Sequence, residues 1–182
     1  MTPSAPRPRP RRRPAPTPAR WGRVRLFAMD VDGVLTDGTV HISSDGSESK
    51  AFSILDGHGL RRLARSGIAV AWISGRASGA TTRRATELAI PHVIQGPVEK
   101  LDSLRTLAAR LGLGAAECAY MGDDEIDVAA MRWAGIAIAP PAAMPVALAA
   151  AHLVTRRSGG HGAVREVCDL LLAARGGKRG SG

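Results

Sequence analysis

Five aspartates stand at or shortly after the ends of two apolar runs, at spacings that could do chemistry. Two follow the run at 24–29 and three follow the run at 118–121. They are Asp30, Asp32, Asp123, Asp124 and Asp127. Carboxylates that lie close together repel one another, and they stay ionised only when a cation sits between them. Because oxygen ligands of this kind suit Mg²⁺, the pattern predicts a magnesium site.

A hydroxyl, an ammonium group and two glycines complete this set. Ser74 and Gly75 follow one strand-like run, and Lys100 opens the helical segment after another. A metal-bound aspartate can attack phosphorus and form an aspartyl-phosphate, while a carboxyl two residues away can protonate the leaving alkoxide and later take a proton from water. The hydroxyl, the ammonium group and backbone N–H groups around Gly33 and Gly75 can bind the phosphoryl oxygens. Together these residue types predict phosphoryl transfer.

The elements that must position these residues alternate between strand and helix. Short apolar runs typical of strands occupy 24–29, 68–73, 92–95, 118–121, 135–138 and 152–154. Segments with helical periodicity occupy 57–65, 77–88, 100–111, 126–134, 145–150 and 162–174. This alternation predicts an α/β fold with a doubly wound parallel sheet, covered on both faces. The ligand site of such a sheet lies beyond the carboxyl ends of its strands, where the candidate residues fall.

One segment interrupts the alternation directly after the first strand. Residues 39–52 read as two short strands around Ser44, Asp45 and Gly46, which is the turn chemistry of a β-hairpin. Apart from this hairpin, only single helices and strands fit between Asp32 and Lys100, so no second domain that could close over the site is expected there. We therefore expect a large substrate or a neighbouring subunit to cover the site.

Composition places the basic charge at the two ends of the chain. The 182 residues are 45% hydrophobic and 23% charged, which is the balance of one globular domain. Of the net charge of +9, six arginines lie in residues 1–20 and three basic residues in 175–182, whereas residues 21–174 carry 16 basic and 16 acidic side chains. The folded core is therefore not expected to bind nucleic acid.

Three parts of the chain are distinguished on this basis. Residues 1–22 hold seven of the 12 prolines and predict a disordered Arg/Pro-rich leader, interpreted as a solubilising appendage. Residues 23–174 are the expected folded domain, and 175–182 a flexible basic tail. No apolar stretch is long enough for a signal peptide or a membrane helix, so we expect a cytoplasmic protein without a membrane partner. Cys118 and Cys168 form no zinc motif and no disulfide framework.

The order of these motifs resembles the haloacid dehalogenase-like superfamily of phosphohydrolases. The matching segments are 30–38, 73–76, Lys100 and 122–127. The resemblance implies that Asp30 is the nucleophile and a metal ligand, and that Asp32 is the general acid and base, with its backbone carbonyl on the metal. It implies that Ser74 and Lys100 hold the phosphoryl group.

The same resemblance assigns the late aspartates. It implies that Asp123 is the third protein ligand of Mg²⁺, and that Asp124 and Asp127 either ligate through water or orient Lys100. Segments 56–59, 95–96 and 155–172 further resemble a capless branch of the superfamily, the 3-deoxy-D-manno-octulosonate 8-phosphate (KDO 8-phosphate) phosphatases of lipopolysaccharide biosynthesis. That branch implies a small sugar-phosphate substrate, a homotetramer formed through the hairpin at 39–52, and a C-terminal segment that shapes a neighbouring active site.

Two departures from the branch leave the sugar open. Leu55 and His161 stand where the branch usually has arginine. Arg76, Arg165 and His58 are the substrate contacts we expect instead, because guanidinium pairs with a sugar carboxylate in bidentate fashion. Arg61, Arg156 and Arg157 are further candidates.

Other functions use similar parts. An acylneuraminate 9-phosphate or related nonulosonate phosphatase, or a non-catalytic assembly domain of the same fold, would keep much of this sequence. A signalling receiver domain also combines aspartates, a hydroxyl and a lysine, but it carries its accepting aspartate after the third strand. The pair Asp30 and Asp32 after the first strand argues against a receiver.

Overall fold

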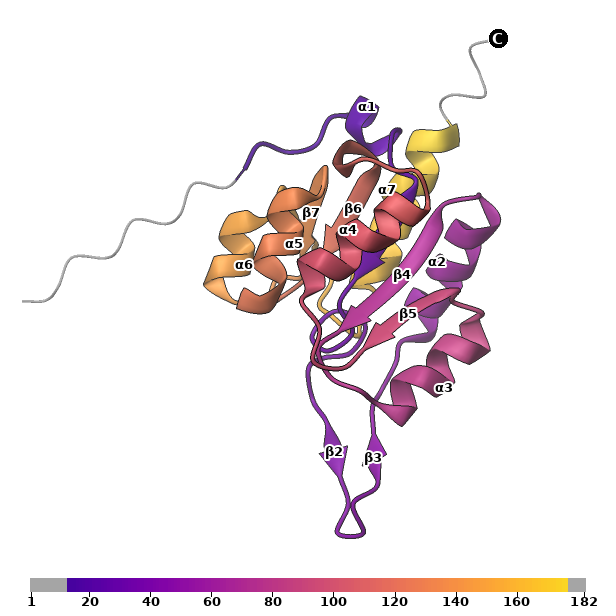
Figure 1. Ribbon diagram of the computed structural model, residues 1–182, viewed down its shortest axis with the longest axis vertical. Coiled ribbons are helices and arrows are strands. Elements are labelled where there is room, and N and C mark those ends of the chain that lie inside the picture. The colour runs from indigo at the N-terminus through magenta and orange to yellow at the C-terminus, as the bar shows by residue number, and fades with distance from the viewer. Residues whose placement is uncertain (1–12, 177–182) are drawn as a thin grey trace, which may run out of the picture.

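A six-stranded parallel sheet is the centre of the computed structural model, which describes residues 13–176 (Figure 1). The strand order is β5-β4-β1-β6-β7-β8, and each neighbouring pair is parallel. The strands are β1 (Leu26–Met29), β4 (Ala69–Ser74), β5 (His92–Gln95), β6 (Cys118–Met121), β7 (Ile136–Ala139) and β8 (Leu153–Val154). The doubly wound α/β fold expected from the sequence is thus confirmed.

Helices cover both faces of the sheet and form two apolar layers with it. One layer joins the sheet to α2 (Ile54–Arg65), α3 (Gly79–Leu88) and α7 (Ala163–Gly176), and the other joins it to α4 (Lys100–Arg110), α5 (Val128–Trp133) and α6 (Pro145–Ala150). Strand β1 divides its side chains between them, with Phe27 and Met29 in the first layer and Leu26 and Ala28 in the second. This period of two, with all four residues buried, is that of a central strand covered on both sides.

The expected strands agree with the structure to within two residues at each end, and the helices differ more. Helix α2 begins three residues earlier than expected because Ser53 caps it, accepting a hydrogen bond from the Leu55 N–H. The segment expected as one helix at 126–134 is a short 3₁₀ turn, η2 (Glu125–Asp127), followed by α5. A second 3₁₀ turn, η1 (Ala115–Glu117), precedes β6.

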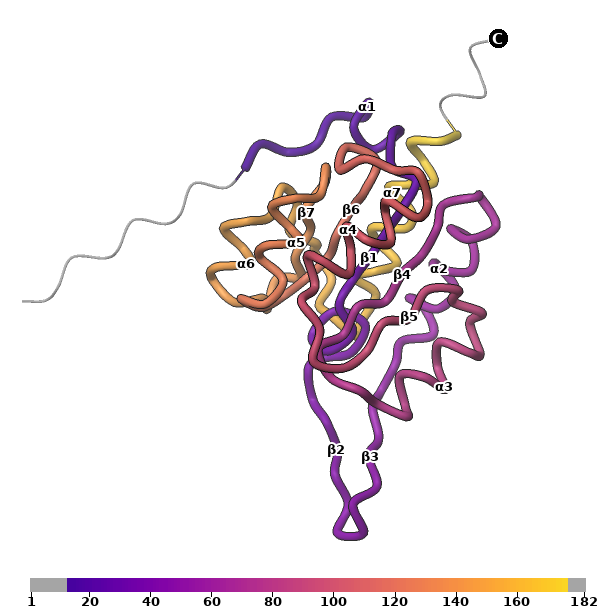
Figure 2. Tube along the Cα trace, in the orientation of Figure 1, coloured from indigo at the N-terminus to yellow at the C-terminus, as the bar shows by residue number. Residues whose placement is uncertain are grey.

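The hairpin expected at 39–52 is present as a separate two-stranded antiparallel sheet. It consists of β2 (His41–Ile42) and β3 (Glu48–Ser49), joined around Gly46, whose φ is +82°. Figure 2 shows it as an arm that extends away from the body, starting from the carboxyl end of the sheet. Within residues 13–176, every helix is too short or too polar to cross a membrane.

The packed structure already begins within residues 1–22, the part of the chain expected to be a disordered leader. Residues 1–12 and 177–182 lie outside the described part, but α1 (Pro18–Trp21) is a turn of helix capped by Thr17. Trp21 is buried, and Arg20 donates to the Gly135 carbonyl and contacts His152. Burial of one indole outweighs the polar composition around it, so residues 18–22 belong to the folded body.

The segment after β8 lies against the loop that follows β1. The N–H of Gly160 donates to the carbonyl of Val34 over 3.1 Å. A Cβ atom at Gly159 would stand 1.9 Å from the carbonyl oxygen of Gly33, so only glycine allows this approach. Asp56 then accepts the N–H groups of Gly162 and Arg165, which fixes the start of α7 against α2.

We predict that Gly159→Ala destabilises the fold by about 1–3 kcal/mol or more, because backbone, and not a flexible side chain, stands where the new methyl group would go. Thermal denaturation measures the change. Gly79→Ala is the matched control, since nothing lies within 4 Å of that position. Equal midpoints for Gly159→Ala and the parent would contradict the packing described.

Candidate functional site

A cavity of about 410 Å³ opens at the carboxyl ends of β1, β4 and β6. The loops that follow these three strands supply its walls, which contain most of the residues expected from the sequence. They are Asp30, Asp32, Gly33, Gly38, Ser74, Gly75, Arg76, Asp123, Asp124 and Ile126. Residues nearly one hundred positions apart therefore meet at one edge of the sheet.

A buried ion-pair network stands at the floor of this site. The Nζ atom of Lys100 lies 2.7 Å from Asp30 Oδ2 and 2.7 Å from Asp127 Oδ1, and these side chains are 1%, 8% and 0% exposed. Burial alone would lower the pKa of Lys100, but the charges and hydrogen bonds of the two aspartates raise it above its usual value. The two aspartates therefore favour the charged form of Lys100.

Asp127 is the hub of this network. Its Oδ1 atom also accepts the hydroxyl of Tyr120 at 2.8 Å, and its Oδ2 atom accepts the backbone N–H groups of Asp123 and Asp124 at 3.1 Å each. A Cβ atom at Gly122 would lie 2.3 Å from the side chain of Asp127, so the glycine makes room for it. Both oxygens of Asp127 are thus engaged in holding the lysine and the loop after β6.

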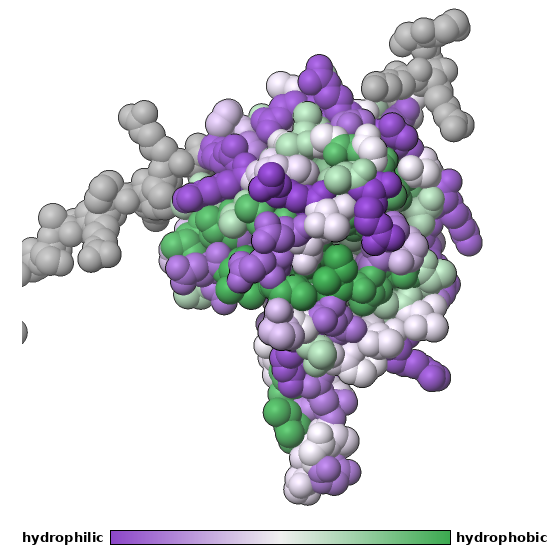
Figure 3. Space-filling view, viewed as in Figure 1, coloured by the Kyte–Doolittle hydropathy of each residue, from purple (hydrophilic) through white to green (hydrophobic). Residues whose placement is uncertain are grey.

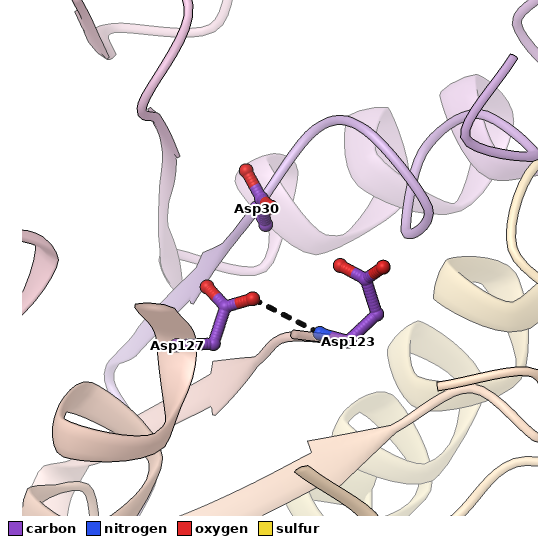
Figure 4. Close-up of side chains that lie close together, drawn as sticks. All are labelled: Asp30, Asp123 and Asp127. Atoms are coloured by element: carbon purple, nitrogen blue, oxygen red, sulfur yellow. Dashed lines mark hydrogen bonds between the residues drawn. The ribbon is translucent and has the colours of Figure 1, made fainter. Parts of the chain in front are cut away.

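The side chains of Asp30, Asp123 and Asp127 lie close together (Figure 4). Each of the three offers a carboxylate oxygen within 4.8 Å of the others. Burial, followed by the charge of Asp127, raises the pKa of Asp30 to about 6. Burial, followed by the charge of Asp30, raises the pKa of Asp123 to about 7. Among the described residues, Lys100 pairs with Asp30 and Asp127 and balances only part of this negative charge.

A divalent cation fits the remaining donor atoms. Asp123 Oδ1 is buried and has no hydrogen-bond partner among residues 13–176. A buried carboxylate oxygen without a partner is costly, and a hard cation is the ligand that such oxygens prefer. Gly33 allows the close approach, since its φ is +80° and a Cβ atom there would lie 2.1 Å from Asp123 Oδ2. Asp30 and Asp123 are therefore the side chains best placed to hold magnesium.

The wall formed by β4 carries the expected hydroxyl. Ser74 is the last residue of β4 and is 2% exposed, with its hydroxyl donating to the Arg76 carbonyl at 3.0 Å. Gly75 follows it and lines the cavity. The arrangement brings a buried carboxylate, the ammonium group paired with it and a hydroxyl to one edge of the sheet, which suits binding of a phosphoryl group and attack on it.

Two residues of the hairpin reach this site and were not identified from the sequence. Lys50 Nζ lies 2.7 and 2.9 Å from the two carboxylate oxygens of Asp32. Glu48 forms an ion pair with Arg76 and accepts the Ser78 hydroxyl at 2.6 Å. The sequence signal for this role was weak: two charges of opposite sign, at positions 48 and 50 of a short strand. Such charges are common on hairpins that face solvent.

The expected substrate contacts divide into two groups. Arg76 lines the cavity, whereas neither His58 nor Arg165 lines it within the described chain. His58 is exposed on α2, and Arg165 pairs with Asp169 beside a separate hollow. Their roles toward a substrate stay predictions.

The C-terminal segment borders the site of its own chain. A smaller hollow of about 310 Å³ shares Gly33, Gly38 and Asp123 with the cavity, and it also contains Ser158, Gly159 and His161. Gly159 and Gly160 allow this segment to lie against the loop after β1, because a Cβ atom at either position would clash with that loop.

Known proteins are similar to this chain in sequence and in fold over most of its length. A family model for haloacid dehalogenase-like hydrolases matches residues 84–167. The 3-deoxy-D-manno-octulosonate 8-phosphate phosphatase of Yersinia pestis is 45% identical over 155 residues, which cover 85% of this chain and 83% of that protein.

Solved structures give the same grouping. The KDO 8-phosphate phosphatase of Moraxella catarrhalis, in complex with a magnesium ion, a phosphate ion and a KDO molecule, is 46% identical with a TM-score of 0.85, covering 87% of this chain and 91% of that one. The cobalt-bound deoxy-D-mannose-octulosonate 8-phosphate phosphatase of Haemophilus influenzae is 36% identical with a TM-score of 0.83, covering 86% and 92%.

We predict that Asp127→Asn lowers both stability and activity, because the amide NH₂ group would face a donor and the lysine would lose a buried countercharge. Breaking a buried pair typically costs about 3–5 kcal/mol. Thermal denaturation and phosphate release measure the two effects. Asp102→Asn is the control: it is the same change at an exposed side chain of α4, outside the lining of the cavity. Equal losses in the two variants would argue against Asp127 as the hub.

Proposed function

The chain belongs to the haloacid dehalogenase-like hydrolases and is a phosphatase of the KDO 8-phosphate phosphatase family, and from this we propose that it releases phosphate from KDO 8-phosphate with Mg²⁺. The observation that carries the proposal is the juxtaposition of Asp30, Asp123 and Lys100 around one opening. The magnesium, phosphate and KDO bound by the Moraxella catarrhalis relative support the same substrate and metal here.

Asp30 is the proposed nucleophile. Its Oδ1 atom accepts the Val31 N–H at 2.7 Å and its Oδ2 atom pairs with Lys100, so the carboxylate is held in one orientation. Attack on phosphorus forms an aspartyl-phosphate and breaks the bond to the sugar oxygen. Magnesium held by Asp30, Asp123 and the Asp32 carbonyl would neutralise carboxylate and phosphoryl charge when bound.

Asp32 is the proposed general acid and base. It lies two residues from the nucleophile and remains 26% exposed, so it can give a proton to the leaving sugar alkoxide. In the second half of the reaction it takes a proton from the water that attacks the aspartyl-phosphate. Lys100, Ser74 and backbone N–H groups near Gly33 and Gly75 would bind the phosphoryl oxygens.

The sugar end of the substrate needs a cationic contact. Arg76 is at the cavity but pairs with Glu48, so within one chain part of its charge is already used. Arg165 and His58 do not line this cavity among the described residues, and in the proposal they contact substrate in the site of a neighbouring copy. The proposal therefore includes a neighbouring copy that helps complete the site.

A homotetramer formed through the hairpin arm fits these features. The arm projects from the open side of the site and carries apolar surface, to which Ile42 contributes with 69% exposure (Figure 3). An isolated two-stranded hairpin is marginal in water and gains stability from packing. The cytoplasmic location stays a prediction.

We expect Mg²⁺-dependent phosphate release from KDO 8-phosphate, lost on chelation of the metal. Asp30→Asn should abolish release while the fold is kept, and Asp32→Asn should lower it by about 10²–10⁴-fold. An acylneuraminate 9-phosphate tested in parallel decides between the two sugar classes. Release by Asp30→Asn at the parent rate would refute the nucleophile assignment.

Light scattering at micromolar concentration should give the mass of a tetramer for the parent. Ile42→Glu should shift it to smaller species, because a charge at the proposed contact resists burial. Leu111→Glu, at a half-exposed site on the body, is the matched control and should leave the mass unchanged. A monomeric parent would rule out the proposed assembly.

A further inference from the structure

Glu48 in β3 and Lys50 directly after it carry opposite charges. Both side chains reach the loops that flank the opening of the cavity. Lys50 binds Asp32 in the loop after β1, and Glu48 binds Arg76 and Ser78 after β4. We propose that Lys50 is a positioning residue that orients Asp32 for proton transfer, and that Glu48 fixes the strand from which it works. This inference rests on the proposed phosphatase function.

The burial of Lys50 makes its contact with Asp32 specific. The Lys50 side chain is 0% exposed, and its Nζ atom lies within 2.9 Å of both oxygens of Asp32. A buried ammonium group is costly unless a countercharge meets it, so Lys50 cannot turn away without a large penalty. Contacts to both oxygens fix the rotation of the carboxylate, and with it the direction of its lone pairs.

Glu48 lies on the same face of the strand as Lys50 and ties it to a second loop, the one after β4. Residues two apart on a strand point to the same side, which is why Glu48 and Lys50 both face the body. Glu48 Oε1 accepts the hydroxyl of Ser78, and Ser78 caps α3 by accepting the Thr81 N–H. The base of the hairpin is therefore tied to α3 as well as to Asp32.

Positioning of this kind has a consequence for the choice of leaving group. A sugar alkoxide is a poor leaving group and needs a proton from Asp32 in the transition state, whereas p-nitrophenolate leaves without one. Loss of orientation at Asp32 should therefore slow the first step for the sugar phosphate far more than for the aryl phosphate. Because kcat/KM reports that first step, later reaction of water with the aspartyl-phosphate does not enter the comparison.

The experiment measures kcat/KM for KDO 8-phosphate and for p-nitrophenyl phosphate in the full chain with Mg²⁺. Lys50→Met removes the charge and keeps the length of the side chain, and Lys50→Arg restores a cation. We expect Lys50→Met to lose at least about tenfold more on the sugar phosphate than on the aryl phosphate, as Asp32→Asn should. Lys50→Arg should recover part of that ratio.

Ser49→Ala is the matched control, because it is exposed between the two charged residues and points to the other side of the strand. It should behave as the parent on both substrates. An equal fall on both substrates in Lys50→Met, or no fall, would overturn the positioning role while the parent remains active. A parent that releases phosphate from neither substrate would overturn the proposed function and this inference with it.

Discussion

The site depends on how the protein balances the negative charge of a cluster of largely buried aspartate side chains. Asp30, Asp123 and Asp127 bring three carboxylates within 4.8 Å of one another, and the buried Lys100 balances part of their charge. Both oxygens of Asp127 accept protein donors, Asp30 shares the cation Lys100 with Asp127, and Asp123 Oδ1 has no partner among residues 13–176. The uncompensated share of the charge therefore falls on Asp30 and Asp123. The raised pKa values of these two aspartates express that imbalance, to which burial contributes most. A divalent cation removes it, and the same cation prepares the site for a phosphoryl group.

The rest of the fold can be understood as support for this cluster. Parallel strands bring the ends of β1, β4 and β6 to one edge, and glycines at 33, 122 and 159 permit contacts that any side chain would block. The hairpin arm is tied to the same edge through buried or half-buried charges, although its strands form a separate sheet. An arm that contacts the proposed acid and base, Asp32, and that meets other copies at its tip in the proposed tetramer, would link assembly to catalysis.

Sequence reasoning predicted the sheet and most of the cavity because both follow from local pattern. Apolar runs gave the strands to within two residues, and residues that follow the runs at 24–29, 68–73 and 118–121 line the cavity. It missed Lys50 and Glu48, since a charge on a hairpin looks solvated until tertiary packing buries it. It also extended the leader to residue 22, whereas Pro18–Trp21 is a turn of helix with a buried Trp21. His58 and Arg165 were expected as substrate contacts from the chemistry of their side chains, and neither lines the cavity within the described chain.

The covalent intermediate on Asp30 is the central claim, and chemical trapping tests it most directly. The parent is mixed with Mg²⁺ and KDO 8-phosphate, quenched in acid within the first turnover and treated with borohydride, which reduces an aspartyl-phosphate to homoserine. Peptide mass spectrometry then locates the reduced residue. The account predicts homoserine at position 30, and only when substrate and metal are both present. Homoserine at another aspartate, or phosphate released during a turnover that leaves Asp30 unmodified, would contradict it.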